Sequence, residues 1–152
     1  MGYRIVVCAK QVPDTKNITG EAMKADGTIN RAALPAVFNP EDRNALEMGL
    51  SLRERFGGKV TVITMGPPRA ADILREALEM GADNVVLLTD RGFAVADTLA
   101  TSYTLAKAVE RAGGADIVLC GRQAIDGDTA QIGPQLAGRM GIGQVTYVIE
   151  VL

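Results

Sequence analysis

The fold of this chain is decided by residues 120–134, which read CGRQAIDGDTAQIGP. They continue an apolar, strand-like run over residues 116–120 and lead into a helical pattern over residues 129–140. Asp128 and Gln131 have the spacing of a capping box, which predicts the start of that helix. A strand end, a glycine-containing turn and a helix N-terminus together present backbone N–H groups and the positive end of a helix dipole. The stretch therefore predicts a site that suits the phosphates of a nucleotide.

Short apolar runs alternate with helical patterns along the rest of the chain. Strands are predicted at residues 4–8, 59–64, 84–88, 116–120 and 144–152, and helices at residues 41–56, 69–80, 94–112 and 129–140. The first four runs are nearly continuous, as is typical of parallel strands that are buried on both faces. The pattern predicts one α/β domain over residues 1–152, with a doubly wound, mostly parallel, Rossmann-like sheet.

Residues 11–38 interrupt this alternation. The dipeptide Asp26-Gly27 is typical of a hairpin turn, so we predict a small hairpin excursion after the first strand. The dipeptide Asn39-Pro40 then predicts the N-cap and the first turn of a helix, where Glu41 and Asp42 meet the helix dipole favourably. At its other end the chain stops inside a strand pattern, so we expect it to be the N-terminal part of a longer subunit.

Composition excludes several classes of function. The chain has 152 residues, 47% of them hydrophobic and 22% charged, with a net charge of −2, so we expect no nucleic-acid surface. It contains no histidine, which excludes Ser-His-Asp and Cys-His catalysis and His-ligated metals. We therefore expect neither a catalytic residue nor a metal, and a chain that binds and positions a ligand.

The two cysteines and the apolar runs suggest where such a chain works. Cys8 and Cys120 end strand-like runs far apart in the sequence, which argues against a disulfide framework and favours a reducing cytoplasm. No apolar run approaches the roughly 18 residues of a transmembrane helix, so membrane insertion is not expected.

Four segments of the chain form an ordered set: VCAKQVPD at residues 7–14, FNPEDRNALE at residues 38–47, MGPP with ALEMGAD at residues 65–68 and 77–83, and residues 121–134. In this order they resemble the beta subunit of electron transfer flavoproteins. Each alone is common, but four in register over nearly the whole chain make the match specific. The resemblance implies an adenine nucleotide held above the strand ends, a heterodimer with an alpha subunit, and electron transfer through FAD to acyl-CoA dehydrogenase-type partners.

The resemblance leaves two nucleotides open, FAD and AMP. Members that hold a structural AMP typically read DDDxNQTG where this chain reads DGDTAQIG at residues 126–133. The present version, like ADTLAT at residues 96–101, is similar to the group that binds a second FAD and bifurcates electrons from NADH. Gly127 and Ala130 replace bulkier polar residues and so leave room beyond the first phosphate. We therefore favour FAD, with NADH as electron donor.

The candidate cofactor-binding residues lie at predicted strand ends and helix starts that match the family segments. They are Cys8, Ala9, Asn39, Pro40, Glu41, Asp42, Met65, Gly66, Asp97, Thr98, Arg122, Gln123, Ala124, Ile125, Asp126, Gly127, Asp128, Thr129, Ala130, Gln131 and Gly133. Helix capping is the alternative role for residues 39–42 and 97–98, core packing for residues 8–9, and a solvated side chain for Arg122.

The residues of the loop at 121–134 are expected to contact different parts of the nucleotide. Backbone N–H groups and Thr129 would meet the phosphates, and Arg122 would pair with a phosphate or approach a flavin ring. Asp126 and Asp128 would cap the helix or bind the ribose.

Two other classes stay open at this point: a non-redox nucleotide-binding module similar to universal stress proteins, and an ATP-pyrophosphatase-like enzyme. The phosphate-binding patterns typical of both are absent from the chain.

Overall fold

The computed structural model describes residues 2–14, 22 and 34–151. Its strands are β1 (Tyr3–Ala9), β2 (Gln11–Pro13), β3 (Ala36–Phe38), β4 (Gly58–Met65), β5 (Asn84–Leu88) and β6 (Ile117–Cys120). Its α-helices are α1 (Pro40–Phe56), α2 (Ala71–Met80), α3 (Thr98–Arg111) and α4 (Ile132–Met140). Two short 3-10 helices, η3 (Pro68–Ala70) and η4 (Arg91–Phe93), follow β4 and β5.

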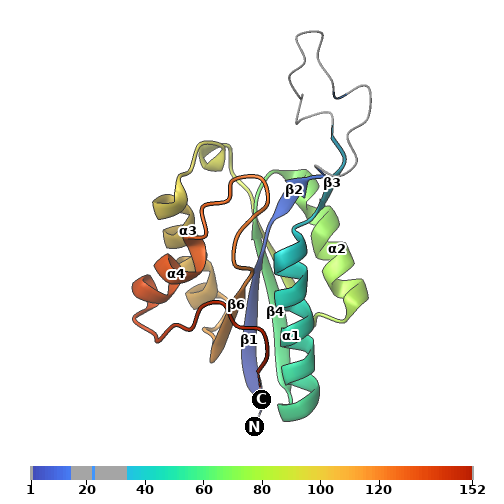
Figure 1. Cartoon of the computed structure of the whole chain (residues 1–152), viewed down its shortest axis with the longest axis vertical. Helices are drawn as coiled ribbons and strands as arrows, with labels where there is room; N and C mark the ends of the chain where they lie inside the picture. Colours follow the sequence, from blue (N-terminus) through green and yellow to red (C-terminus); the bar gives the residue numbers. More distant parts are fainter. Residues whose placement is uncertain (1, 15–21, 23–33, 152) are drawn as a thin grey trace.

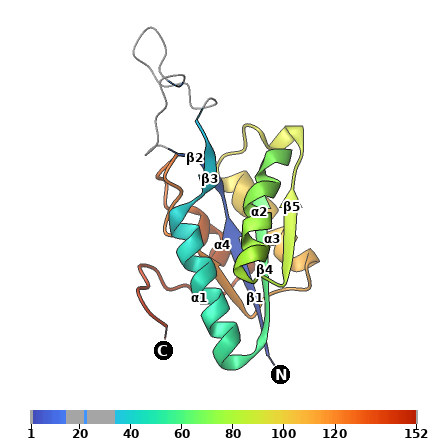
Figure 2. The ribbon, with the colours of Figure 1, turned by 90° about the vertical axis from the view of Figure 1, so that its right-hand side faces the viewer.

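Four strands form a parallel sheet in the order β5-β4-β1-β6, which confirms the predicted sheet. Helices α1 and α2 cover one face and α3 and α4 cover the other, as Figures 1 and 2 show from two directions. Side chains of β1 alternate between the two faces, since Ile5 and Val7 belong to the core under α1 and α2, whereas Val6 and Cys8 belong to the core under α3 and α4. The fold is therefore doubly wound, with a hydrophobic core on each side.

The hairpin excursion is also confirmed. Strands β2 and β3 pair antiparallel, with Gln11 opposite Phe38 and Pro13 opposite Ala36. The predicted turn at Asp26-Gly27 lies outside the described residues.

The strand predicted at residues 144–152 is wrong. Residues 142–151 form no strand, and the side chains of Val145 and Ile149 are 84% and 97% exposed. An apolar pattern can pair as a strand only where a sheet edge accepts its backbone hydrogen bonds, and this segment pairs with no strand among the described residues. Val151 alone in this segment packs against the core of α1 and α2.

Three helices begin later than the sequence pattern predicts. Helices α2, α3 and α4 start at Ala71, Thr98 and Ile132, two to four residues after the predicted positions 69, 94 and 129. The residues before α2 form η3, and those before α3 form η4 and a turn. These tighter conformations satisfy the same local preference for helical backbone angles. Among the described residues, no helix is long and apolar enough to cross a membrane.

Candidate functional site

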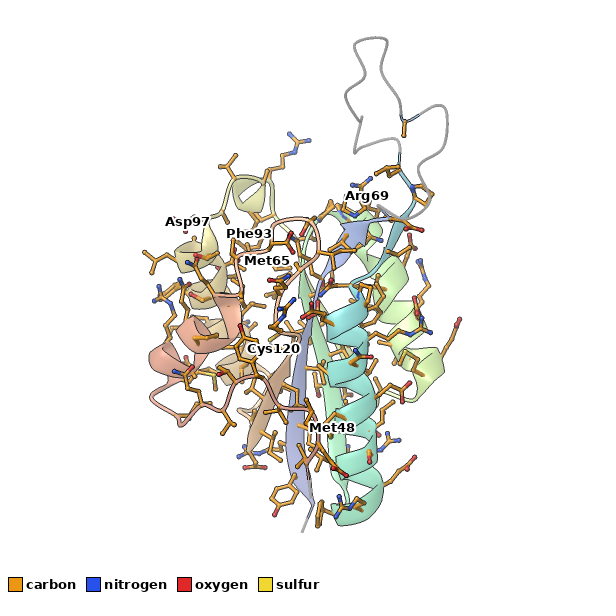
Figure 3. All side chains as sticks on the ribbon, in the orientation of Figure 1. Met48, Met65, Arg69, Phe93, Asp97 and Cys120 are labelled. Carbon is orange, nitrogen blue, oxygen red and sulfur yellow. The ribbon has the colours of Figure 1, made fainter. Side chains whose placement is uncertain are left out.

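A cavity of about 920 Å³ opens at the carboxyl ends of the parallel strands. Its floor includes Cys8 and Ala9 at the end of β1 and Cys120 at the end of β6. Figure 3 shows Met65, Phe93 and Cys120 between strand β1 and the helices α3 and α4. A cavity of this size at the strand ends of an open α/β sheet is the usual place for a nucleotide or similar cofactor.

Most of the predicted site residues line this cavity. They are Cys8, Ala9, Asp42, Met65, Gly66, Asp97, Thr98, Arg122, Gln123, Ala124, Gly127, Asp128, Thr129, Ala130 and Gln131. The others do not line it: Asn39, Pro40, Glu41, Ile125, Asp126 and Gly133.

Sequence reasoning missed one wall of the cavity. Residues 89–91, 93–94 and 96 line it, together with Lys10, Pro67, Pro68, Thr101, Leu105 and Cys120. Residues 89–96 follow β5 directly, so the rule that ligands bind at carboxyl strand ends was the signal that could have found them.

The side chain of Asn39 reaches the loop after β6 and makes no hydrogen bond to its own helix. Its side chain is fully buried, with Nδ2 donating to the carbonyl of Gln123 at 2.9 Å and Oδ1 accepting from the N–H of Ile125 at 3.2 Å. Asn39 is the N-cap residue of α1 and Pro40 stands in its first turn, as predicted, and the Asn39 carbonyl accepts the N–H of Arg43 at 3.0 Å, whereas its side chain makes no capping hydrogen bond. Both polar atoms of the buried amide therefore have a partner in the loop.

The next acidic residues of α1 extend this contact. Glu41 accepts from the N–H of Gln123 at 3.0 Å and pairs with the guanidinium of Arg122 at 3.1 Å. Asp42 accepts from the N–H of Lys10 at 2.9 Å and from the N–H of Gly121 at 3.0 Å. Asn39, Glu41 and Asp42, hereafter the α1 clamp, thus tie the loop after β6 to the first turn of α1.

The carboxyl of Asp42 is buried in the clamp. Burial raises its pKa from 3.8 to about 6, against the opposing effect of hydrogen bonds from Asn39 and from the N–H groups of Lys10 and Gly121. Only 7% of the residue remains accessible to solvent. The carboxyl therefore holds the ends of β1 and β6 together at a cost in desolvation.

The raised pKa of Asp42 predicts a pH dependence of stability. The folded chain keeps this proton up to about pH 6, whereas the unfolded chain loses it near 3.8, so the folded state binds more protons between these values. The contribution of Asp42 to stability should fall by roughly 1–3 kcal/mol as the pH rises through this window, and then stay constant. Urea unfolding of the wild type and of Asp42→Asn across the window measures it, because other titrating groups cancel in the difference. A difference that does not vary with pH would contradict the prediction.

The capping box predicted at the start of α4 is wrong. The helix begins at Ile132, and Asp128 accepts from Nε2 of Gln123 at 2.8 Å. Asp128 and Ala130 have φ values of 50° and 52°, which place two non-glycine residues in the left-handed region. Such conformations cost of the order of 1 kcal/mol each and are typically kept at functional sites. Residues 128–131 therefore form an irregular rim of the cavity.

The opposite side of the cavity is held by helix α3. Asp97 caps that helix by accepting from the N–H of Ala100 at 2.8 Å, as predicted. Thr98 donates to the side chain of Gln131 at 3.0 Å and accepts from Gln135 at 3.2 Å. These bonds join the α3 side to the rim, so Asp97 and Thr98 face the cavity while they also hold its shape.

The cations near the loop are mostly neutralised. Arg122 pairs with Glu41 although its side chain is 47% exposed, and Lys10 pairs with Asp126 at 2.8 Å. Arg91 also lines the cavity and makes no ion pair within the described part of the chain. A ligand phosphate would therefore meet backbone N–H groups and Arg91 more readily than Arg122 or Lys10.

Comparison with known proteins identifies close relatives. The family model for the electron transfer flavoprotein domain matches residues 26–152 of this sequence. The electron transfer flavoprotein subunit beta of Clostridium acetobutylicum is 56% identical over 147 residues, which cover 97% of this chain and 56% of that protein. Protein FixA of Bradyrhizobium diazoefficiens is 53% identical, over 96% of this chain and 51% of its own. Subunit CarD of the caffeyl-CoA reductase-Etf complex of Acetobacterium woodii is 52% identical, over 97% of this chain and 56% of its own. The chain spans about half the length of the curated relatives it matches.

Proposed function

The chain belongs to the electron transfer flavoprotein family, and we propose that it is the nucleotide-binding domain of a beta subunit that carries electrons through a flavin. The observation that carries this proposal is the cavity of about 920 Å³ at the strand ends, with the Gly127-containing loop along its edge. Membership of this family sets aside the stress-protein-like module and the ATP-pyrophosphatase-like enzyme. Residues 1–152 would form a single domain of a longer, cytoplasmic subunit.

We propose FAD, with AMP as the alternative, as the nucleotide in this cavity. The cavity reaches from the loop after β6 across to residues 89–96 after β5, which leaves room beyond a single nucleotide. A Cβ added to Gly127 would meet no protein atom within 4 Å, so the loop leaves open space where a cofactor can approach the backbone. Similarity to the subunit of the caffeyl-CoA reductase-Etf complex supports a flavin in this chain.

The residues that line the cavity would hold FAD in distinct ways. Cys8, Ala9 and Gly66 offer small surfaces at the strand ends, where an adenine ring can pack closely. Gly127 and Thr129 would present N–H and hydroxyl groups to the phosphates, with Arg91 as the cation. Bound FAD would supply the redox chemistry, accepting electrons from NADH, and this chain would position it and exclude water.

Two residues of the α1 clamp, Asn39 and Glu41, would act on the cofactor through the loop. Asn39 is fully buried, and neither it nor Glu41 lines the cavity. Pro40, Ile125, Asp126 and Gly133 likewise lie outside its lining. We therefore assign these residues to positioning the loop, and direct contact to Asp42 and to the lining residues of the loop itself.

We propose that the partner is an electron transfer flavoprotein alpha subunit, in a complex that passes electrons to an acyl-CoA dehydrogenase-type enzyme. Exposed apolar side chains support an interface on this chain. Leu99 and Tyr103, four residues apart on α3, are 60% and 53% exposed, and Val145 and Ile149 are more exposed still. An exposed apolar pair on one helix face, such as Leu99 and Tyr103, is typical of surfaces that another protein covers.

Extraction of the bound nucleotide tests both proposals. The full-length chain is purified alone and as the complex with its alpha subunit, and each sample is acid-treated and separated by chromatography. We expect the complex to release a second FAD per heterodimer and no AMP, and the chain alone to have lost most of its nucleotide. AMP in equal amount to FAD would replace the FAD proposal by a single-flavin carrier. Stoichiometric FAD on the isolated chain would contradict the dependence on the partner.

A further inference from the structure

Cys8 and Cys120 lie side by side at the floor of the cavity, although they are far apart in the sequence. Strands β1 and β6 pair in parallel, with Cys8 directly opposite Cys120. Neighbouring strands lie about 4.8 Å apart, and disulfide-bonded cysteines usually have Cα atoms about 4.4–6.8 Å apart. Both side chains belong to the core on the α3 and α4 face, so they point the same way from the sheet. Both are free thiols.

The two thiols differ in their access to solvent. Cys8 is 6% exposed, and its hydrogen bond with Cys120, together with burial, raises the pKa of its thiol well above the usual value. Cys120 is half-buried and lines the cavity next to Gly133, where an added Cβ would lie 3.7 Å from the Cβ of Cys120. A small reagent that enters the cavity would therefore meet Cys120 first, with Cys8 behind it.

We propose that Cys8 and Cys120 are an oxidisable dithiol that closes to a disulfide across β1 and β6, and that a nucleotide in the cavity shields it. The oxidant is a peroxide. The Cys120 sulfur attacks the O–O bond of hydrogen peroxide, becomes a sulfenic acid, and water leaves. The Cys8 sulfur then attacks the Cys120 sulfur, the S–S bond forms, and the sulfenic oxygen leaves as a second water with the proton of Cys8.

The dithiol itself depends only on the strand register, whereas the shielding rests on the proposed nucleotide site. Both cysteines line the cavity in which the nucleotide would lie. Bound nucleotide would cover the path to Cys120, so the oxidation rate should follow the fraction of vacant sites. At a nucleotide concentration about ten times Kd, this predicts about tenfold slower disulfide formation.

The test is peroxide treatment of the full-length chain with its nucleotide removed, followed by thiol blocking, trypsin digestion and mass spectrometry. We expect residues 5–10 (IVVCAK) and residues 112–122 (AGGADIVLCGR) as one cross-linked species that dithiothreitol separates. Recovery of the two peptides only as separate species, under peroxide that oxidises free glutathione completely, would overturn the proposal. A disulfide that joins two copies of the chain would overturn it equally.

Two variants test the order of attack. In Cys8→Ser, dimedone should label Cys120 as a sulfenic acid, because no second thiol resolves it. In Cys120→Ser, Cys8 should stay unlabelled, and equal labelling of both variants would overturn the assignment of Cys120 as the first site.

The effect of nucleotide on the cross-linking rate is measured in a separate experiment. FAD or AMP is added, and its binding is measured in parallel. Slower cross-linking with bound nucleotide supports the shielding, and an unchanged rate with nucleotide demonstrably bound overturns it. Cross-linking in a complex with the alpha subunit that binds neither nucleotide would support the dithiol and contradict the proposed function.

Discussion

The Gly121→Ala variant is expected to lose about 2–4 kcal/mol of unfolding free energy, because the loop after β6 can no longer lie against α1. A Cβ on Gly121 would lie 2.7 Å from the backbone nitrogen of Asp42 and 2.7 Å from the carbonyl carbon of Glu41. These are backbone atoms in the first turn of a helix, which cannot turn aside as a flexible side chain would. The shift would also break the hydrogen bond from Gly121 to the buried carboxylate of Asp42.

The Gly127→Ala variant is the matched control, in the same loop. A Cβ at Gly127 meets nothing within 4 Å, so this change should stay within about 0.5 kcal/mol of the wild type. Urea unfolding followed by circular dichroism measures both variants under the same conditions. Equal stability of the two variants would show that the α1 clamp does not hold the loop as described.

The Gly127→Val variant is expected to lose nucleotide affinity by about ten- to hundredfold while its fold stays intact. Gly127 lines the cavity, and its φ lies outside the left-handed region, so a side chain there is free of backbone strain and of clashes with the protein. The branched side chain would instead occupy space that a cofactor phosphate needs beside the loop backbone. Nucleotide content and titration calorimetry of the complex with the alpha subunit measure the loss.

A valine at Gly143 serves as the control for this second prediction. A Cβ added at Gly143 would also meet nothing within 4 Å, but this residue does not line the cavity. Nucleotide content should therefore be unchanged in Gly143→Val. If Gly127→Val keeps as much nucleotide as Gly143→Val, the loop after β6 is not part of the binding site.

The sequence by itself determined the parallel sheet, its two helical layers and the position of the cavity. Continuous apolar runs such as those of β1, β4 and β5 have to be buried on both faces, and helices between them allow only parallel pairing in a short chain. Carboxyl strand ends then meet at one edge, so the cavity lies where the loop at residues 120–134 predicted it. Periodicity and local chemistry are enough to predict these features, and a single sequence contains both.

Only the tertiary structure decided which hydrogen bonds the polar side chains at that edge make. Asn39 and Asp128 fit local capping rules, but each bonds to Gln123 instead, and for Asn39 that partner is 84 positions away in the sequence. The strand predicted at residues 144–152 fails because no described edge pairs with it, and Cys8 meets Cys120 only through the register of β1 and β6. The reason is that hydrogen bonds between distant segments are chosen by which groups remain buried and unpaired once the sheet has formed, and sequence spacing carries no record of that competition.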